Sequence, residues 1–313
     1  MRAIRSVPAL TAVALAFAVT GCGASADDAA DDGRISVVTS TNVWGSVAKA
    51  VGGDRVSVES LINDAAADPH GYVDKPEDAT KLSGAALAIY NGGGYDDFFA
   101  KLTDAAGQGA KRIEAFEIAG HESETEEEHE GEEHEHGEVN EHVWYDLPTV
   151  QKVADRIARD LGEVEPDNKA EFAANAEAFN TALDGLIAKA AEIGAAHPGG
   201  KVVATEPVAK YLLDAAGLTD ATPPDFSEAI EEETDPPVLA VADTTDLITN
   251  KQVLALVNNA QTETPVTNQL REAATTAGVP VVDVTETLPP GVTDYVEWMT
   301  EQVTALSDAL AGT

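Results

Sequence analysis

The 313-residue sequence contains one cysteine, Cys22, so an intramolecular disulfide is excluded. Basic residues are scarce, because 19 Lys and Arg stand against 56 Asp and Glu, which gives a formal net charge of −37. This imbalance argues against nucleic-acid binding and against electrostatic docking on anionic lipids, and it favours a cationic ligand. Aromatic residues make up only 5% of the chain. The wide aromatic or Arg-lined cleft of a siderophore or corrinoid binder is therefore not expected.

Two kinds of catalytic or nucleotide motif are also missing. No Gly-rich loop follows an expected strand and opens a helix, so nucleotide binding is not expected. A secreted metallohydrolase would need an open coordination position beside a general base. The sequence contains no His-Glu-x-x-His or comparably compact motif for that purpose. We therefore expect a protein that is not an enzyme.

The N-terminus has the order of a secretory leader. Two arginines precede the apolar run Val7–Val19, and small residues follow it up to the cysteine. The run is shorter than the about 20 apolar residues of a membrane-spanning helix. Residues 1–21 are therefore expected to be a lipoprotein signal peptide, with Cys22 as the lipidated first residue of the mature protein. The small, acidic segment 22–32 is expected to be a flexible tether.

The remaining residues, roughly 280, are enough for two lobes of ordinary domain size. Strand-like and helix-like runs alternate in residues 33–148 and again in residues 199–313, which predicts two β/α lobes with mainly parallel sheets. The expected strands are 35–39, 56–62, 85–90, 201–205, 253–257 and 280–284. The expected helices of the lobes are 43–51, 78–82, 208–216 and 269–278.

Residues 149–198 are expected to link the lobes through helices. After a first helix at 150–161, apolar residues recur at three- and four-residue intervals from Glu165 to Ala195, which predicts one amphipathic helix. At 1.5 Å per residue this helix would be roughly 45 Å long and would act as a rigid strut. The predicted fold class is α/β, with two lobes joined by one long helix.

Residues 121–141 have a different composition, with eleven Glu, four His and almost no apolar side chain. Such a segment has too little apolar surface to offset the entropy of ordering, so we expect a disordered surface loop. Its imidazoles and carboxylates could hold Zn²⁺ weakly as an accessory site. The neighbouring carboxylates also favour protonated imidazole, which opposes metal binding, and a solvated charge run is the alternative. The candidate accessory residues are His121, His129, His134 and His136.

Only three histidines lie outside that loop, and metal capture needs neutral imidazoles or carboxylates that converge from rigid positions. His70 stands in Asp-Pro-His-Gly-Tyr after an expected strand. His142 stands in Glu-His-Val-Trp-Tyr-Asp, where the acidic loop rejoins ordered structure. His197 closes the long helix and is expected to be a helix C-terminal residue.

The order and spacing of several short motifs resemble the metal-binding solute-binding proteins of zinc and manganese ABC importers, which form solute-binding protein family 9. These motifs are 39–44, 52–54, 68–70, 90–93 and 142–144. The resemblance implies a metal buried in the cleft between two lobes, each of which gives two ligands. It also implies a monomer that works with an ABC permease and a separate ATPase subunit. The protein would then be extracytoplasmic and lipid-anchored to the outer face of the cell membrane.

The resemblance assigns the ligands position by position. His70 and His142 match the two histidines of the first lobe. Glu206 takes the place of a histidine five residues before a tyrosine, here Tyr211. Glu286 takes the place of an aspartate in a turn after a late strand. Two carboxylates give the site harder ligand atoms and more negative charge than a site with three histidines would have. This shifts the expected metal toward Mn²⁺ or Fe²⁺ without excluding Zn²⁺.

Several alternatives stay open. Asp283 competes with Glu286 for the fourth ligand position, although it falls within an expected strand. Helix capping is the alternative role for both glutamates. The alternative functions are an adhesin-like surface lipoprotein with a structural metal and a secreted metallohydrolase. Residues 223–226 and 259–264 are interpreted as cleft or inter-lobe loops. Packing is the expected role of Trp44, Trp144 and Trp298.

Overall fold

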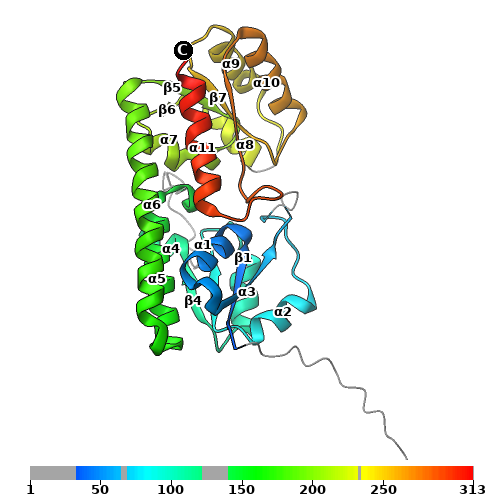
Figure 1. The fold of residues 1–313 in the computed structure, drawn as a ribbon. Coiled ribbons are helices and arrows are strands. Elements are labelled where there is room, and N and C mark those ends of the chain that lie inside the picture. Colours follow the sequence, from blue (N-terminus) through cyan, green and yellow to red (C-terminus); the bar gives the residue numbers. More distant parts are fainter. Residues whose placement is uncertain (1–32, 65–68, 122–139, 232–233, 313) are drawn as a thin grey trace, which may run out of the picture. The chain divides into compact units, whose positions relative to one another are not determined.

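The structure, a computed structural model, describes residues 33–64, 69–121, 140–231 and 234–312. The expected signal peptide, Cys22, the whole tether and nearly all of the acidic segment lie outside these residues. Arg34–Thr313 form one compact unit, which contains two parallel four-stranded sheets (Figure 1). We call the elements around the first sheet the N-terminal lobe and those around the second sheet the C-terminal lobe.

The first sheet has the strand order β2-β1-β3-β4. Its strands are β1 (Ile35–Thr41), β2 (Val56–Ile62), β3 (Leu87–Tyr90) and β4 (Lys111–Glu114). Neighbouring residues of β1 face opposite sides, so Val37 and Val38 belong to different core clusters. The Val37 side packs on α1 and on the helix α5 (Leu147–Val164), and the Val38 side packs on α2 and α3. The helices of this lobe are α1 (Asn42–Gly52), α2 (Pro76–Ser83), α3 (Asp97–Ala106) and α4 (Ala115–Ala119).

The second sheet repeats this order as β6-β5-β7-β8. Its strands are β5 (Lys201–Ala204), β6 (Thr219–Asp220), β7 (Ala255–Asn259) and β8 (Val281–Val284). One face packs on α7 and α11, and the other packs on α8, α9 and α10. These helices are α7 (Lys210–Ala215), α8 (Pro224–Glu231), α9 (Val238–Thr249), α10 (Pro265–Ala277) and α11 (Tyr295–Leu310). The interpretation of 223–226 as a loop was wrong, because Pro224 opens α8 and Phe226 is buried in the core.

Helix α6 (Lys169–Ala196) joins the lobes and packs on α1 of one and α11 of the other (Figure 1). It follows α5 (Leu147–Val164) after the 3₁₀ turn Pro166–Asn168. Its apolar stripe is buried, as the periodicity predicted, and continues the core from one sheet to the other. The predicted α/β class, with two parallel sheets and one long helix, is confirmed.

The segment 285–295, which leads into α11, ties the C-terminal lobe to the N-terminal lobe by several hydrogen bonds. The Asn42 amide donates to the Leu288 carbonyl and accepts from the Leu288 N–H, at 3.2 and 3.1 Å. Ser46 Oγ accepts from the Tyr295 N–H at 2.8 Å. Tyr145 donates its O–H to the Thr285 carbonyl at 2.8 Å. These bonds and the α6 strut together favour small local movements over a large hinge rotation.

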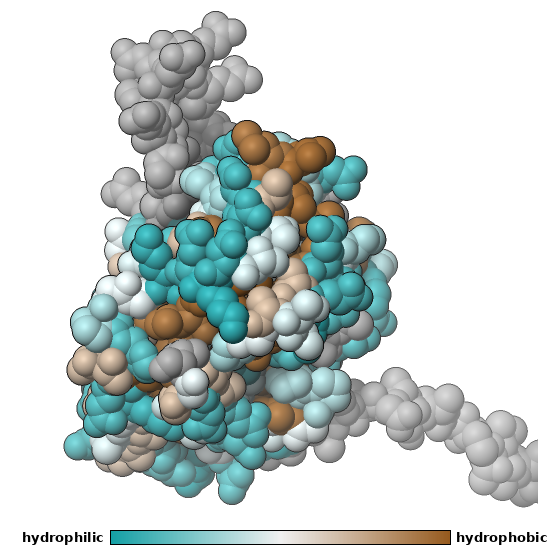
Figure 2. Space-filling model, turned by 90° about the horizontal axis from the view of Figure 1, so that it is seen from above, coloured by the Kyte–Doolittle hydropathy of each residue, from teal (hydrophilic) through white to brown (hydrophobic). Residues whose placement is uncertain are grey.

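No helix among the described residues is both long and apolar enough to cross a membrane. The end of the molecule near α9 and α10 mixes hydrophilic and hydrophobic side chains (Figure 2). Large apolar side chains with high exposure include Val238 and Leu239, the first two residues of α9. The three tryptophans are fully buried, which confirms their packing role.

Candidate metal-binding site

The candidate residues follow the carboxyl ends of parallel strands, where open α/β sheets usually bind ligands. His70 follows β2 on a turn, and His142 follows β4 and α4. Glu206 and Glu286 come two residues after β5 and β8. Because the sheets are parallel, these positions collect at one edge of each sheet. The topology therefore turns four distant segments toward a common space.

His70, His142, Glu206 and Glu286 all line one cavity of about 710 Å³. Three further acidic residues line its wall, namely Glu231, Asp235 and Glu263. Among the described residues that line it there is no Lys, Arg, Phe, Tyr or Trp side chain. An acidic wall with two imidazoles suits a cation and opposes an anionic chelate. The structure thus brings together the four residues that the sequence singled out.

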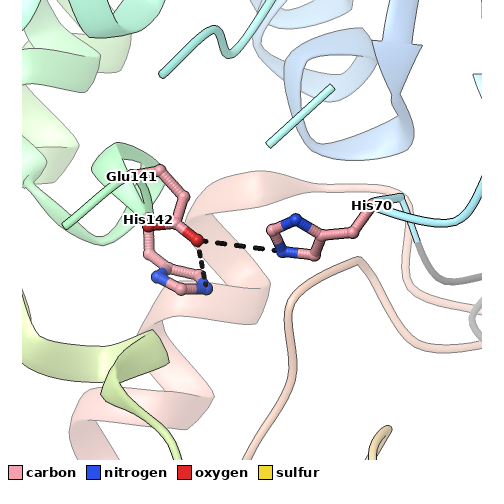
Figure 3. Close-up of side chains that lie close together, drawn as sticks. All are labelled: His70, Glu141 and His142. Atoms are coloured by element: carbon pink, nitrogen blue, oxygen red, sulfur yellow. Dashed lines mark ion pairs between the residues drawn. The ribbon is translucent and has the colours of Figure 1, made fainter. Parts of the chain in front are cut away.

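The two histidines form a compact cluster with Glu141 (Figure 3). Glu141 Oε1 lies 3.8 Å from His70 Nε2 and 3.9 Å from His142 Nε2. One ligand atom from each of the three residues lies within 4.8 Å of the others. The His70 side chain is 41% exposed, whereas His142 is buried. The cluster therefore has one accessible imidazole and one enclosed imidazole.

The tautomer of His142 follows from its partner, Asn140. Asn140 Oδ1 accepts from the His142 backbone N–H at 3.0 Å, and its Nδ2 donates to the Pro207 carbonyl at 2.9 Å. The amide orientation is therefore set, and Oδ1 acts as the acceptor for His142 Nδ1 at 3.1 Å. Nδ1 carries the proton, so Nε2 presents a lone pair toward Glu141. Burial, helped by the charge of His70, lowers the pKa of His142 from 6.5 to about 3, so this imidazole is neutral.

Asn259 holds the two predicted glutamates side by side. Its Nδ2 donates to Glu206 Oε2 at 2.7 Å and to Glu286 Oε1 at 2.8 Å. Its Oδ1 accepts from the Gln261 N–H, which sets the orientation of the amide. The other two oxygens accept from Thr262 Oγ1 and from Tyr95, whose O–H lies 3.1 Å from Glu286 Oε2. The two buried carboxylates are thus oriented by neutral hydrogen-bond donors.

Tyr95 connects the glutamates with the histidines. Its ring meets the His70 ring edge to face at 4.9 Å and lies 6.0 Å from the His142 ring. The same side chain hydrogen-bonds Glu286 of the other lobe. Tyr95 therefore packs behind His70, His142 and Glu286 and links side chains of both lobes.

Burial raises the pKa of Glu141, and the charge of Glu286 raises it further. Contacts of Glu141 with its own backbone, His70 and Glu231 act in the opposite direction. The carboxyl group thus lies within reach of groups from both lobes. Glu141 is not among the side chains that line the cavity.

The remaining candidates lie elsewhere. Asp283 belongs to β8, accepts from Asn258 at 3.0 Å and pairs with Arg271, so it does not compete with Glu286 in this structure. His197 ends α6, as predicted. His121 lies against Phe116 at a ring distance of 5.0 Å. His129, His134 and His136 fall outside the described residues.

The sequence interpretation did not single out Glu141 or Asn259. Glu141 is the last of eleven glutamates in a charge run, so only its position beside His142 distinguished it. Asn259 opened the segment 259–264 that was interpreted as a cleft loop, and residues 262–264 line the cavity. Asn259 acts through hydrogen bonds to residues that are 53 and 27 positions away in the sequence, and no local pattern reveals such contacts.

Comparisons with known proteins agree on one family. The model of the family described as "Zinc-uptake complex component A periplasmic" (ZnuA) matches residues 37–309. The substrate-binding lipoprotein FimA of a metal ABC transporter in Streptococcus parasanguinis is 29% identical, over 71% of each chain. PsaA, the corresponding lipoprotein of a manganese ABC transporter in Streptococcus pneumoniae, is 28% identical over the same shares. The periplasmic zinc-binding protein TroA from Treponema pallidum has a similar fold, with a TM-score of 0.70, 19% identity and coverage of 89% and 99%.

Proposed function

Because the chain belongs to the ZnuA family of metal solute-binding proteins, we propose that it captures one divalent transition-metal ion and delivers it to an ABC importer. The observation that supports this most is the convergence of His70, His142, Glu206 and Glu286 on one cavity. These residues come from four segments and both lobes. Ligands drawn from distant segments can enclose a single ion, although no compact motif in the sequence contains them.

The four residues have the chemistry of metal ligands. His142 is neutral and presents Nε2, and a metal ligand must be unprotonated. Glu206 and Glu286 are held by fixed donors and supply hard oxygen atoms. Two imidazoles and two carboxylates suit Zn²⁺, Mn²⁺ or Fe²⁺. In our proposal the ion is the cargo, and no catalytic step takes place.

We place this activity outside the cytoplasm. The curated relatives named above are lipoproteins, which supports the assignment of Cys22 as the lipidated residue after removal of 1–21. The protein would be anchored to the outer face of the cell membrane as a monomer. Its partners would be the permease and a separate ATPase subunit.

Release would require only local movement. The hydrogen bonds from Asn42, Ser46 and Tyr145 hold the two lobes together. The turn with His70 and the segment 262–264 line the cavity from opposite lobes. We propose that displacement of these segments at the permease opens the site.

Calorimetric titration of the metal-free protein with Zn²⁺ and with Mn²⁺ tests the function. Wild type is expected to bind one ion tightly, and the ratio of the two affinities ranks the metals. His70→Ala removes an accessible ligand at little cost to folding and is expected to weaken binding by at least about 100-fold, because a lost supporting residue alone costs about 10–100-fold. Unchanged one-site binding in this variant would overturn the assignment.

The acidic segment is assigned an accessory role, which a deletion tests. Removing residues 122–138 takes away ten glutamates and three histidines but none of the four residues that line the cavity. The deletion is expected to leave the tight site unchanged and to abolish only weak additional Zn²⁺ binding. Equilibrium dialysis at rising Zn²⁺ counts both classes of site. Loss of the tight site would show that the segment belongs to it.

A further inference from the structure

Glu141 lies between the two histidines of the site. Its Oε1 lies 3.8 and 3.9 Å from the two Nε2 atoms. These separations are too long for hydrogen bonds, which end near 3.5 Å. At His142 the Nε2 atom carries a lone pair, because Nδ1 donates to Asn140 Oδ1. His142 Nε2 and Glu141 Oε1 therefore lie near each other without a hydrogen bond, and a cation between them would be attracted to both atoms.

The spacing fits a shared ion. Two ligand atoms about 2.1 Å from one metal lie roughly 3.0 to 4.2 Å apart, from a right angle to opposite positions. Both contacts of Glu141 Oε1 fall in this range. The third separation, between the two histidines, is at most 4.8 Å. A small inward shift of His70 on its exposed turn would bring all three atoms to one ion.

The backbone of Glu141 is fixed on both sides. Its carbonyl accepts from Asn91 Nδ2 at 2.8 Å and from the Val143 N–H at 2.7 Å. The preceding residue, Asn140, receives the Tyr211 O–H on its carbonyl at 2.6 Å. The side chain of Glu141 thus starts from an anchored backbone, which helps to preorganise a ligand.

We propose that Glu141 is a fifth metal-ligating residue, which adds a carboxylate oxygen between His70 and His142 and favours Mn²⁺ over Zn²⁺. Zn²⁺ is satisfied by four ligands in a tetrahedron, whereas Mn²⁺ prefers six-coordinate sites rich in oxygen. A third carboxylate therefore benefits Mn²⁺ more. The inference rests on the proposed function, since it concerns the same ion.

The test compares Glu141→Gln with Glu263→Gln. Both remove one negative charge near the ion, but Glu263 lies on the cavity wall outside the three-residue cluster. In calorimetry, Glu141→Gln is expected to weaken Mn²⁺ binding about 10- to 100-fold and Zn²⁺ binding much less. Glu263→Gln is expected to change both affinities by a similar small factor. The electron paramagnetic resonance spectrum of bound Mn²⁺ should change in Glu141→Gln only.

Two outcomes are decisive. The inference is overturned if the two substitutions lower Mn²⁺ affinity equally and the Mn²⁺ spectrum is unchanged. Glu141 would then act only through its negative charge and not as a ligand. Failure of the proposed function is visible separately, because wild type would then bind neither ion tightly or His70→Ala would bind as wild type does. Circular dichroism melting of both variants controls for folding.

Discussion

Replacing His142 by glutamine is expected to lower the affinity for Zn²⁺ and Mn²⁺ by at least about 100-fold, because even residues that merely support a ligand contribute about 10–100-fold. Glutamine keeps most of the volume of this 3% exposed side chain, so the loss reports on the imidazole and not on packing. Calorimetric titration of the metal-free variant measures the effect. His197→Gln is the matched control, since His197 ends α6 and does not line the cavity. If His142→Gln binds both ions as wild type does, His142 is no ligand.

The same variant is expected to change the acid sensitivity of the metal-free protein. The pKa of His142 is about 3 in the folded state against an ordinary value of 6.5. Between these values the unfolded chain binds a proton that the folded chain does not. The free energy of unfolding therefore falls as the pH falls below 6.5, by up to about 1.4 kcal/mol per pH unit from this group. Urea unfolding from pH 7 to pH 4.5 is expected to show a shallower slope in His142→Gln, and parallel slopes would contradict the burial of a neutral imidazole.

Replacing Asn259 by leucine is expected to have the second large effect. The substitution removes the donors of two hydrogen bonds to buried carboxylates, at 2.7 and 2.8 Å. Bonds to charged groups contribute about 1.5–3 kcal/mol each, so we expect the loss of both to lower the free energy of unfolding by about 3–6 kcal/mol. Glu206 and Glu286 would also lose their common orientation, and metal affinity is expected to fall about 10- to 100-fold. Chemical denaturation and calorimetry measure the two effects.

Asn258 provides the matched control on the same strand. It is equally buried, but its amide donates to Asp283 at 3.0 Å on the side away from the cavity. Asn258→Leu is expected to reduce stability and to leave metal affinity within roughly threefold of wild type. If both variants lose affinity in proportion to stability, Asn259 has only a structural role.

Much of the fold could be predicted because the buried strands and the long helix have strong patterns. Strands β1, β2 and β3 are continuous or β-branched runs, and α6 repeats its apolar residues over 28 positions. The prediction missed β4 and β6. In β4 only Ile113 is buried and apolar, and β6 has two residues. Both are edge strands, which are often short and polar, so their sequences lack a strand pattern.

The candidate site could be predicted only in part, for a different reason. His70, His142, Glu206 and Glu286 were found through motif positions, and the structure places all four on one cavity. The roles of Glu141 and Asn259 depend on contacts with side chains of other segments. The charge of Glu141 is hidden in the acidic run, and nothing local marks an asparagine that donates to two glutamates. Tertiary contacts of this kind appear only once the sheets are placed.

The ties between Asn42, Ser46 and the segment 288–295 also concern folding kinetics. Residues separated by 246 to 249 positions meet there. Contacts between residues so far apart in sequence are expected to form late in folding, because the entropic cost of closing the long loop between them precedes the gain from the bonds. We therefore expect the N-terminal lobe to complete its packing only after the C-terminal residues have been synthesised and have packed against it. A nascent chain would thus reach its ion-binding form at the last step of folding, after almost the whole sequence is available.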